Sequence, residues 1–235
     1  MERENTETSP AFRYAITNRL RLKFLQRWLP QMKGMGFNFG AGSSDWSFLV
    51  PQAARMWRMD VTACEGKKVD VLMDIQRTAI QTGSLDWILC SEVIEHVPDF
   101  KAALREIHRA LKPGARLILT VPFSVPLHGE PHDYWRFTGH ALQALAPEMG
   151  FRIVDLKPMG NFRTFFWQTL ALDYHRRFAW VPEDLPFPKR VLLKGFRSTV
   201  PLFLSFSYGM AFLGDSKGNP GGHILSWGAC LEKSG

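Results

Sequence analysis

Residues 84–123 carry the pattern that most constrains the fold. Residues 85–90 are a short apolar run, which is typical of a strand buried on both faces of a parallel sheet. Asp99 can cap a following helix, whose apolar positions recur at helical spacing: Ala103, Leu104, Ile107 and Leu111. Pro113-Gly114 predicts a turn, and residues 115–121 form a second apolar strand. Such a strand–helix–strand unit predicts a sheet with helices packed on its faces.

The same alternation of strand and helix runs from residue 34 onward. Further strands are expected at 35–39, 55–61, 69–73, 151–156 and 223–232, and further helices at 46–55 and 139–149. Together these elements predict a doubly wound, mostly parallel α/β sheet of seven strands, with its ligand at the carboxyl ends of the strands.

We expect one domain over residues 10–235, preceded by a disordered tail at 1–9. Its expected parts are a basic helix at 10–30, a ligand-binding core at 34–156, an acceptor loop at 124–140 and a lid insertion at 160–222. The basic helix has an apolar stripe made of Phe12, Ile16, Leu20, Phe24 and Trp28. This stripe either packs on its own domain or lies on an anionic membrane surface.

The formal net charge is +7, which favours an anionic partner or serves solubility. The three cysteines, Cys64, Cys90 and Cys230, form no CxxC pair, so neither a disulfide framework nor a zinc site is expected from them. The first ten residues lack an apolar signal core, and we expect a cytoplasmic protein.

A glycine loop, GAGSS, follows the first strand. Gly40 and Gly42 permit a sharp turn and a close approach to a ligand, although an ordinary turn is the alternative. The missing third glycine argues against a nicotinamide oxidoreductase. Asp60 lies about 20 residues further on, where an acid can accept ribose hydroxyls. Asp74 follows the third strand and can accept from an adenine amino group, but either acid can also be a cap or surface residue.

The runs SEVIEHV and RALKPGARL, with the glycine loop and the two acids, resemble class I S-adenosylmethionine (SAM)-dependent methyltransferases of the type 11-like branch. The resemblance covers about residues 34–156 and implies SAM as the cofactor. Its implied cofactor-binding residues are Asn38, Gly40, Gly42, Asp60, Asp74, Ser91 and Glu92. Asn38 stands where the family's first motif has an acid, and Ser44 replaces its last glycine.

The expected acceptor loop is dense in polar groups, and its HGEPHDYWRFT run is similar to text in a branch of bacterial SAM methyltransferases. We predict catalytic residues His128, His132, Asp133 and Arg136, with a histidine as general base and Arg136 as an anion contact. No metal is part of this prediction. Two alternatives stay open: a metal held by His128, Glu130 and His132, or a hydrogen-bonded structural lid.

The uncharged run 198–214 is either a buried lid helix or a shallow membrane contact helped by nearby basic residues. We therefore predict a SAM-dependent methyltransferase acting on an O or N acceptor of a small-molecule or lipid-linked envelope substrate. Peripheral contact with an anionic inner membrane stays open. The alternatives are a SAM-binding protein without turnover and a nucleic-acid methyltransferase. Nucleic acid is the less expected partner, because the sequence has no RNA-binding appendage and no NPPY-type motif.

Overall fold

The computed structural model describes residues 16–42, 45–63, 69–178, 186–213 and 222–235. The chain divides into two compact units. The sheet unit comprises residues 21–159 and 226–235, and the helical unit comprises residues 1–20 and 160–225. The predicted tail at 1–9 and the start of the predicted basic helix lie outside the described residues, as do Ser43, Ser44 and Cys64.

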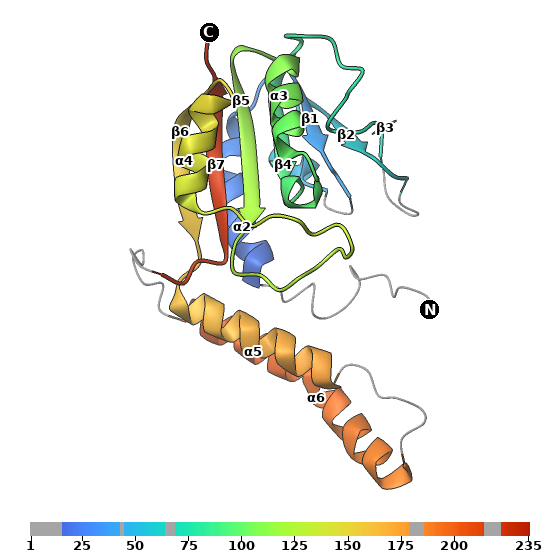
Figure 1. Ribbon diagram of the computed structural model, residues 1–235. Coiled ribbons are helices and arrows are strands. Elements are labelled where there is room, and N and C mark those ends of the chain that lie inside the picture. The colour runs from blue at the N-terminus through green and yellow to red at the C-terminus, as the bar shows by residue number, and fades with distance from the viewer. Residues whose placement is uncertain (1–15, 43–44, 64–68, 179–185, 214–221) are drawn as a thin grey trace. The chain divides into compact units, whose positions relative to one another are not determined.

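Seven strands form one sheet in the order β3-β2-β1-β4-β5-β7-β6 (Figure 1). They are β1 (Met35–Phe39), β2 (Arg55–Asp60), β3 (Val71–Leu72), β4 (Leu85–Ser91), β5 (Leu111–Pro122), β6 (Phe151–Met159) and β7 (Ser226–Lys233). The strands pair in parallel except that β7 runs antiparallel to both β5 and β6. The predicted doubly wound, mostly parallel sheet is confirmed.

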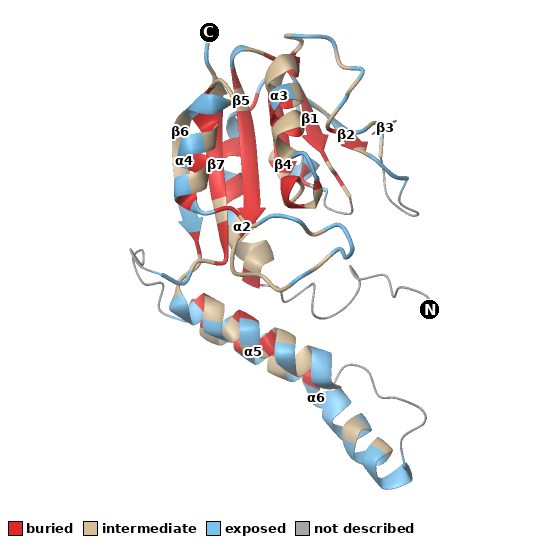
Figure 2. Ribbon diagram, in the orientation of Figure 1, coloured by how far each residue is buried: buried red, intermediate tan, exposed pale blue. Residues whose placement is uncertain are grey.

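Helices cover both faces of this sheet. In the sheet unit they are the part of α2 (Ile16–Trp28) from Arg21 onward, α3 (Phe100–Ala110) and α4 (Gly139–Glu148). Short 3-10 turns η1, η2 and η3 lie at Leu29–Gln31, Ser47–Leu49 and Ile94–His96. The interior of the sheet is buried, as the red strands of Figure 2 show.

Two neighbouring residues of β7 show how the helices reach opposite faces. A Cβ atom on Gly139 of α4 would lie 2.5 Å from the Trp227 ring. A Cβ atom on Gly228 would lie 2.7 Å from the Phe24 ring of α2. Because successive side chains of a strand point to opposite faces, α4 and α2 pack on opposite sides of β7. Phe24 and Trp28 of the predicted apolar stripe are buried here, so this part of the stripe packs within the protein.

The helix predicted after β4 is confirmed as α3. The Asp99 carboxylate accepts a hydrogen bond from the Ala102 amide at 2.9 Å, which satisfies one of the free N–H groups of the first turn. The turn predicted at Pro113-Gly114 is wrong in position, because Leu111 already pairs with Leu85. Gly114, with φ of 74°, belongs instead to the irregular part of β5 where the register shifts.

The helix predicted over residues 46–55 is wrong. The structure has only the turn η2, and the Asp45 carboxylate just before it accepts a hydrogen bond from the Ser47 amide at 2.9 Å. Pro51 follows closely and cannot continue a helix because it lacks a donor.

The helical unit contains α5 (Phe162–Phe178) and α6 (Phe187–Phe212), which pack against each other. Ala171, Val200 and Leu204 are buried between them, and the Tyr174 and Phe203 rings stack with centroids 4.2 Å apart. Both helices lie between β6 and β7 in the chain, and the action of this insertion as a lid stays a prediction. Among the described residues, no helix combines the length and the apolar character needed to cross a bilayer.

Candidate active site

The carboxyl ends of β1, β2, β4 and β5 meet at one edge of the sheet, because these strands are parallel neighbours. In α/β folds of this kind, ligands bind at that edge. The predicted cofactor residues Asn38, Gly40, Asp60, Ser91 and Glu92 lie at or next to these strand ends, so the strand order brings together residues that are far apart in the sequence.

The glycine loop and Asp60 are in direct contact. The Asp60 carboxylate accepts hydrogen bonds from the Gly42 amide and the Val61 amide, each at 2.7 Å. Gly40 and Gly42 have φ values of 64° and 49°, a region that glycine adopts without strain. Gly40 also passes close to a neighbour, since a Cβ atom there would lie 2.5 Å from Val93. The loop is therefore held against the end of β2 by an acid.

Asn38 and Glu92 place further polar groups at this edge. Asn38 is 2% exposed and sits between Arg58 of β2 and Leu89 of β4 in the sheet. Its side-chain amide nitrogen and the buried Glu92 Oε1 have no hydrogen-bond partner among the described residues. Glu92 has φ of 56°, a costly conformation for a residue with a side chain. Buried polar groups normally have partners, and a polar ligand at this edge would supply them.

Ser91 and Asp74 both have hydrogen-bond partners within the protein. The Ser91 hydroxyl bonds to the Thr120 hydroxyl at 2.8 Å, which ties the ends of β4 and β5 together. Asp74 is exposed and accepts from the Gln76 amide at 2.8 Å, as a turn-forming acid does. Its role toward an adenine group stays a prediction.

The segment after β5 is held in place by Glu95 of η3. The Glu95 carbonyl accepts hydrogen bonds from the Tyr134 and Trp135 amides at 2.8 and 3.2 Å. The Trp135 ring nitrogen donates to the Val97 carbonyl at 3.0 Å. The predicted acceptor loop is therefore docked on the turn that follows β4, at the edge that carries Glu92.

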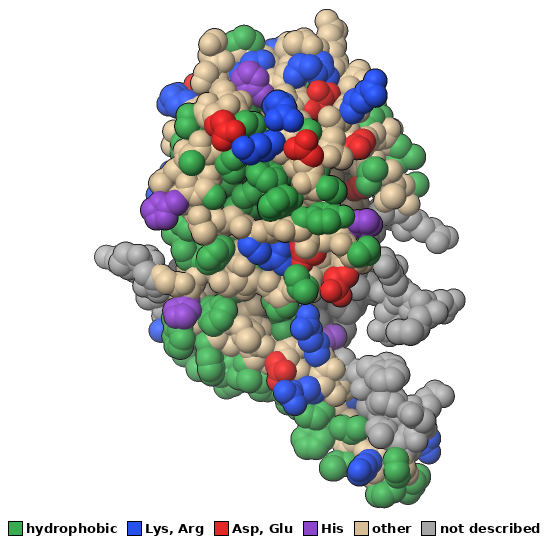
Figure 3. All heavy atoms as spheres, in the orientation of Figure 1, with side chains coloured by type: hydrophobic (Ala, Val, Ile, Leu, Met, Phe, Trp, Pro, Cys, Tyr) green, Lys and Arg blue, Asp and Glu red, His purple; other side chains and the backbone are tan. Residues whose placement is uncertain are grey.

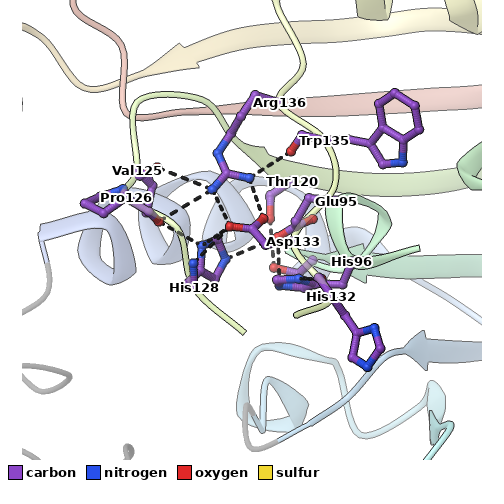
Figure 4. A network of polar contacts seen from close by, with 11 residues as sticks. Glu95, His96, Thr120, Val125, Pro126, His128, His132, Asp133, Trp135 and Arg136 are labelled. Carbon is purple, nitrogen blue, oxygen red and sulfur yellow. Dashed lines mark hydrogen bonds and ion pairs between the residues drawn. The ribbon is translucent and has the colours of Figure 1, made fainter. Parts of the chain in front are cut away.

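Asp133 and Arg136 form a bidentate ion pair inside this loop, with N–O distances of 2.6 and 2.7 Å (Figure 4). The Asp133 side chain is 2% exposed and also accepts from the His128 amide at 2.9 Å. Arg136 holds the pKa of Asp133 well below its usual range. Both side chains thus organise the loop, and a direct part in catalysis stays a prediction for each.

His128 and His132 have different surroundings. The His128 ring lies near two acids, with its Nε2 3.9 Å from Glu95 and its Nδ1 3.5 Å from Asp133. The neighbouring Glu95 raises the pKa of His128, and burial raises the pKa of Glu95 itself. The His132 ring is exposed and bonds to the Tyr134 hydroxyl at 3.0 Å. Of the two predicted bases, His128 is the one with carboxylates within 4 Å of both ring nitrogens, and its part as a base stays a prediction.

Sequence reasoning missed Glu95 and His96. The alternative metal site at His128, Glu130 and His132 is not assembled within the described part of the chain, where Glu95 and His96 are the groups gathered beside His128. The run Ile94-Glu95-His96-Val97 held the available signal, since an acid and a histidine stood between apolar residues directly after a predicted strand.

Comparisons with known proteins agree with this arrangement. Residues 49–119 match the family model described as "Methyltransferase domain". A ubiquinone biosynthesis O-methyltransferase from Xanthomonas oryzae pv. oryzae is 38% identical over 69 residues, which are 29% of this chain and 28% of that protein. A protein of the same name from Xanthomonas euvesicatoria is 48% identical over 42 residues, 18% of each chain. The chain thus matches under a third of the length of these curated relatives.

Three solved structures share the fold. The [4+2]-cyclase SpnF has a TM-score of 0.57 at 17% identity, covering 92% of this chain and 80% of that one. A SAM-dependent methyltransferase from Archaeoglobus fulgidus has a TM-score of 0.55 at 13% identity, covering 96% of this chain and 95% of that one. Phosphoethanolamine N-methyltransferase 2 from Haemonchus contortus, solved with SAM, has a TM-score of 0.54 at 15% identity, covering 98% of this chain and 58% of that one. Residues 49–119 therefore resemble a methyltransferase domain, and the chain shares the fold of these solved structures.

Proposed function

We propose that the protein is a SAM-dependent methyltransferase that acts on an oxygen or nitrogen atom of its acceptor. The observation that carries this proposal is the contact between Asp60 and the glycine loop at the edge shared by β1, β2 and β4. It occurs in a chain whose residues 49–119 match a methyltransferase domain. SAM supplies an activated methyl group, so the protein has to bind it, orient the acceptor and exclude water.

The residues at this edge fit SAM in their chemistry. Asp60 accepts from the Gly42, Val61 and Thr62 amides and keeps acceptor capacity that suits a ribose hydroxyl. The unpartnered Asn38 amide and Glu92 carboxylate supply a donor and an acceptor for the charged amino-acid part of SAM. The loop of residues 124–140 supplies the acceptor side, with His128 as the proton acceptor.

The Asp60→Ala variant is expected to lose about 1–3 kcal/mol of SAM binding, or roughly 5- to 150-fold in Kd, because a buried ribose loses its acceptor. Titration calorimetry measures this loss. Asp173→Ala, which changes an exposed acid of α5, serves as the matched control and should bind as the wild type does. Unchanged SAM affinity in Asp60→Ala, or tight NAD binding by the wild type, would overturn the assignment.

A SAM-binding protein without methyl transfer is the second candidate, and one finding favours it. The fold is shared with a [4+2]-cyclase, so the architecture alone does not fix the reaction. An assay that measures S-adenosylhomocysteine formed from SAM, with a panel of hydroxyl and amine acceptors, separates the two candidates. Formation of S-adenosylhomocysteine with an acceptor supports methyl transfer, and SAM binding without it supports the second candidate.

We further propose that the acceptor is lipid-linked and that α6 provides peripheral contact with an anionic membrane. One face of α6 is buried, at Val200, Leu204 and Ala211. Large apolar residues are exposed on the rest of its surface: Phe187, Val191, Leu192, Phe196, Leu202 and Phe206. Exposed basic residues accompany them at Lys189, Lys194 and Arg197. Figure 3 shows this mixture of hydrophobic and basic side chains, which is typical of helices that lie at a membrane interface.

Replacing Leu202 and Phe206 together with aspartate is expected to reduce co-sedimentation with anionic vesicles, because both apolar contact area and electrostatic attraction are lost. Phe48→Asp is the control, since Phe48 is 68% exposed but lies in η2 of the sheet unit. Vesicles that contain phosphatidylserine and vesicles of phosphatidylcholine alone separate the charge contribution from the apolar one. Equal sedimentation of both variants and the wild type would contradict the proposal.

A further inference from the structure

Three side chains at the docked loop converge on one point. Glu95, His96 and His128 each offer one ligand atom, and these atoms lie within 4.8 Å of one another. Glu95 and His96 come from η3 after β4, while His128 comes from the loop after β5. Figure 4 shows the two imidazoles directed toward the carboxylate.

Glu95 is the group that needs an explanation. Its side chain is 0% exposed, and neither carboxylate oxygen has a hydrogen-bond partner among the described residues. Its Oε1 lies 3.6 Å from His96 Nε2 and 3.9 Å from His128 Nε2, which is too far for a hydrogen bond. A buried carboxylate without a hydrogen-bond partner is costly, and a cation bound between Glu95 and the two imidazoles would compensate its charge.

Both imidazoles are fixed so that their Nε2 atoms face this carboxylate. The Nδ1 of His96 contacts the His132 carbonyl at 2.6 Å, and the Nδ1 of His128 contacts the Pro126 carbonyl at 3.1 Å. A carbonyl only accepts, so each Nδ1 carries the hydrogen. In the neutral ring the Nε2 lone pair then points toward Glu95, so the three candidate ligand atoms face one another.

From this arrangement we infer that Glu95, His96 and His128 form a binding site for a divalent transition-metal ion of the Zn²⁺ class. Two histidines and one carboxylate are a common ligand set for such ions. Ligand atoms bound at about 2.1 Å in a tetrahedron lie roughly 3.4 Å apart. The two distances to Glu95 are 3.6 and 3.9 Å, and all three ligand atoms lie within 4.8 Å of one another, so the side chains have to draw closer together around a bound ion. The carbonyls behind each Nδ1 are the outer partners that metal-bound histidines usually have.

The site differs from the alternative that the sequence suggested. Glu130 and His132 belong to the same loop, but the His132 ring bonds to Tyr134 and contributes only its backbone carbonyl to the cluster. An ion held by three protein ligands keeps a position for water or a substrate oxygen. A part in activating the acceptor would rest on the proposed methyl transfer, whereas the ion site itself does not.

Metal binding by the purified full chain tests the inference. The protein is stripped with a chelator and titrated with Zn²⁺ in competition with a chromogenic chelator. We expect one Zn²⁺ per chain. Glu95→Gln and His128→Ala should each weaken binding by more than the roughly 10- to 100-fold that follows loss of an outer partner. Co²⁺ in place of Zn²⁺ gives a visible absorption band that His96→Ala and His128→Ala should both lose.

His132→Ala and Glu130→Ala are the matched controls, because they change the same loop and leave the three ligands and the His132 carbonyl in place. Both should bind Zn²⁺ as the wild type does. Thermal unfolding of each variant identifies those that fail to fold, in which case the remaining ligand variants decide. Absence of stoichiometric Zn²⁺ in the wild type, unchanged affinity in His128→Ala, or loss in His132→Ala would overturn the site. SAM binding is measured separately, so failure of the metal site leaves the proposed function standing.

Discussion

The Arg136→Met variant is expected to lose about 3 kcal/mol of unfolding free energy at neutral pH. Met keeps the apolar part of the side chain but leaves the Asp133 carboxylate, which is 2% exposed, without the guanidinium that neutralises it. An uncompensated buried charge is the largest cost that a single substitution in this loop can introduce. Urea unfolding followed by circular dichroism measures the change.

The pH dependence of this loss provides an internal check. Arg136 lowers the pKa of Asp133 in the folded protein, so the pair stabilises the fold above the unfolded pKa of about 4. That contribution disappears as the pH falls through the folded pKa. The difference between wild type and Arg136→Met should therefore shrink below about pH 4.

Two further variants complete this test. Arg152→Met breaks the exposed pair with Glu232 and should change stability by less than about 1 kcal/mol. Arg136→Met combined with Asp133→Asn should recover part of the loss, because no buried charge is left behind. If Arg136→Met were as harmless as Arg152→Met, the pair would not hold the loop.

The His128→Ala variant is expected to lower turnover by about 10²- to 10⁴-fold, whereas His132→Ala should change it only slightly. Glu95 can stabilise the imidazolium that forms when His128 accepts a proton from the acceptor, and the same ring is a ligand in the inferred metal site. Both roles require His128. The exposed His132 ring bonds to the Tyr134 hydroxyl and is not one of the three ligands of the inferred metal site.

Formation of S-adenosylhomocysteine from SAM, with a panel of hydroxyl and amine acceptors, measures this turnover. Calorimetry should give an unchanged SAM Kd for both variants, since neither residue lies at the glycine loop. Activity that a chelator abolishes and Zn²⁺ restores would identify the metal role, and activity that survives the chelator would identify the base. Equal losses in the two variants would contradict the geometry.

The sequence predicted the elements whose signals are local. An apolar run that ends in a polar residue marks β4, and a carboxylate three residues before an amide it can cap marks the start of α3. The helix over 46–55 was wrong because its pattern was weak and a proline interrupts it. Gly42 and Asp60 are in contact because the strand order of this fold brings their loops together, and their part in cofactor binding stays a prediction.

The loop cluster was beyond such reasoning because its contacts are long-range. Glu95 and His128 are separated by more than thirty residues and meet only because β4 and β5 are neighbours and the loop folds back on η3. Arg136 was expected to contact an anion of the substrate. Its guanidinium instead pairs with both carboxylate oxygens of Asp133, three residues earlier. Short-range pairing of that kind depends on the loop conformation, which no periodic pattern encodes.

The pairing of β6 with β7 has a consequence for how this chain can vary. Met159 and Ser226 are direct partners in the antiparallel ladder, so the chain leaves the sheet and returns to it at adjoining points. A two-residue hairpin would close the same ladder. Because closure entropy grows only with the logarithm of loop length, about 0.6 kcal/mol for each doubling, the sheet is nearly indifferent to the length of what lies between. The length of the 160–225 segment can therefore change at little cost to the register of β6 and β7.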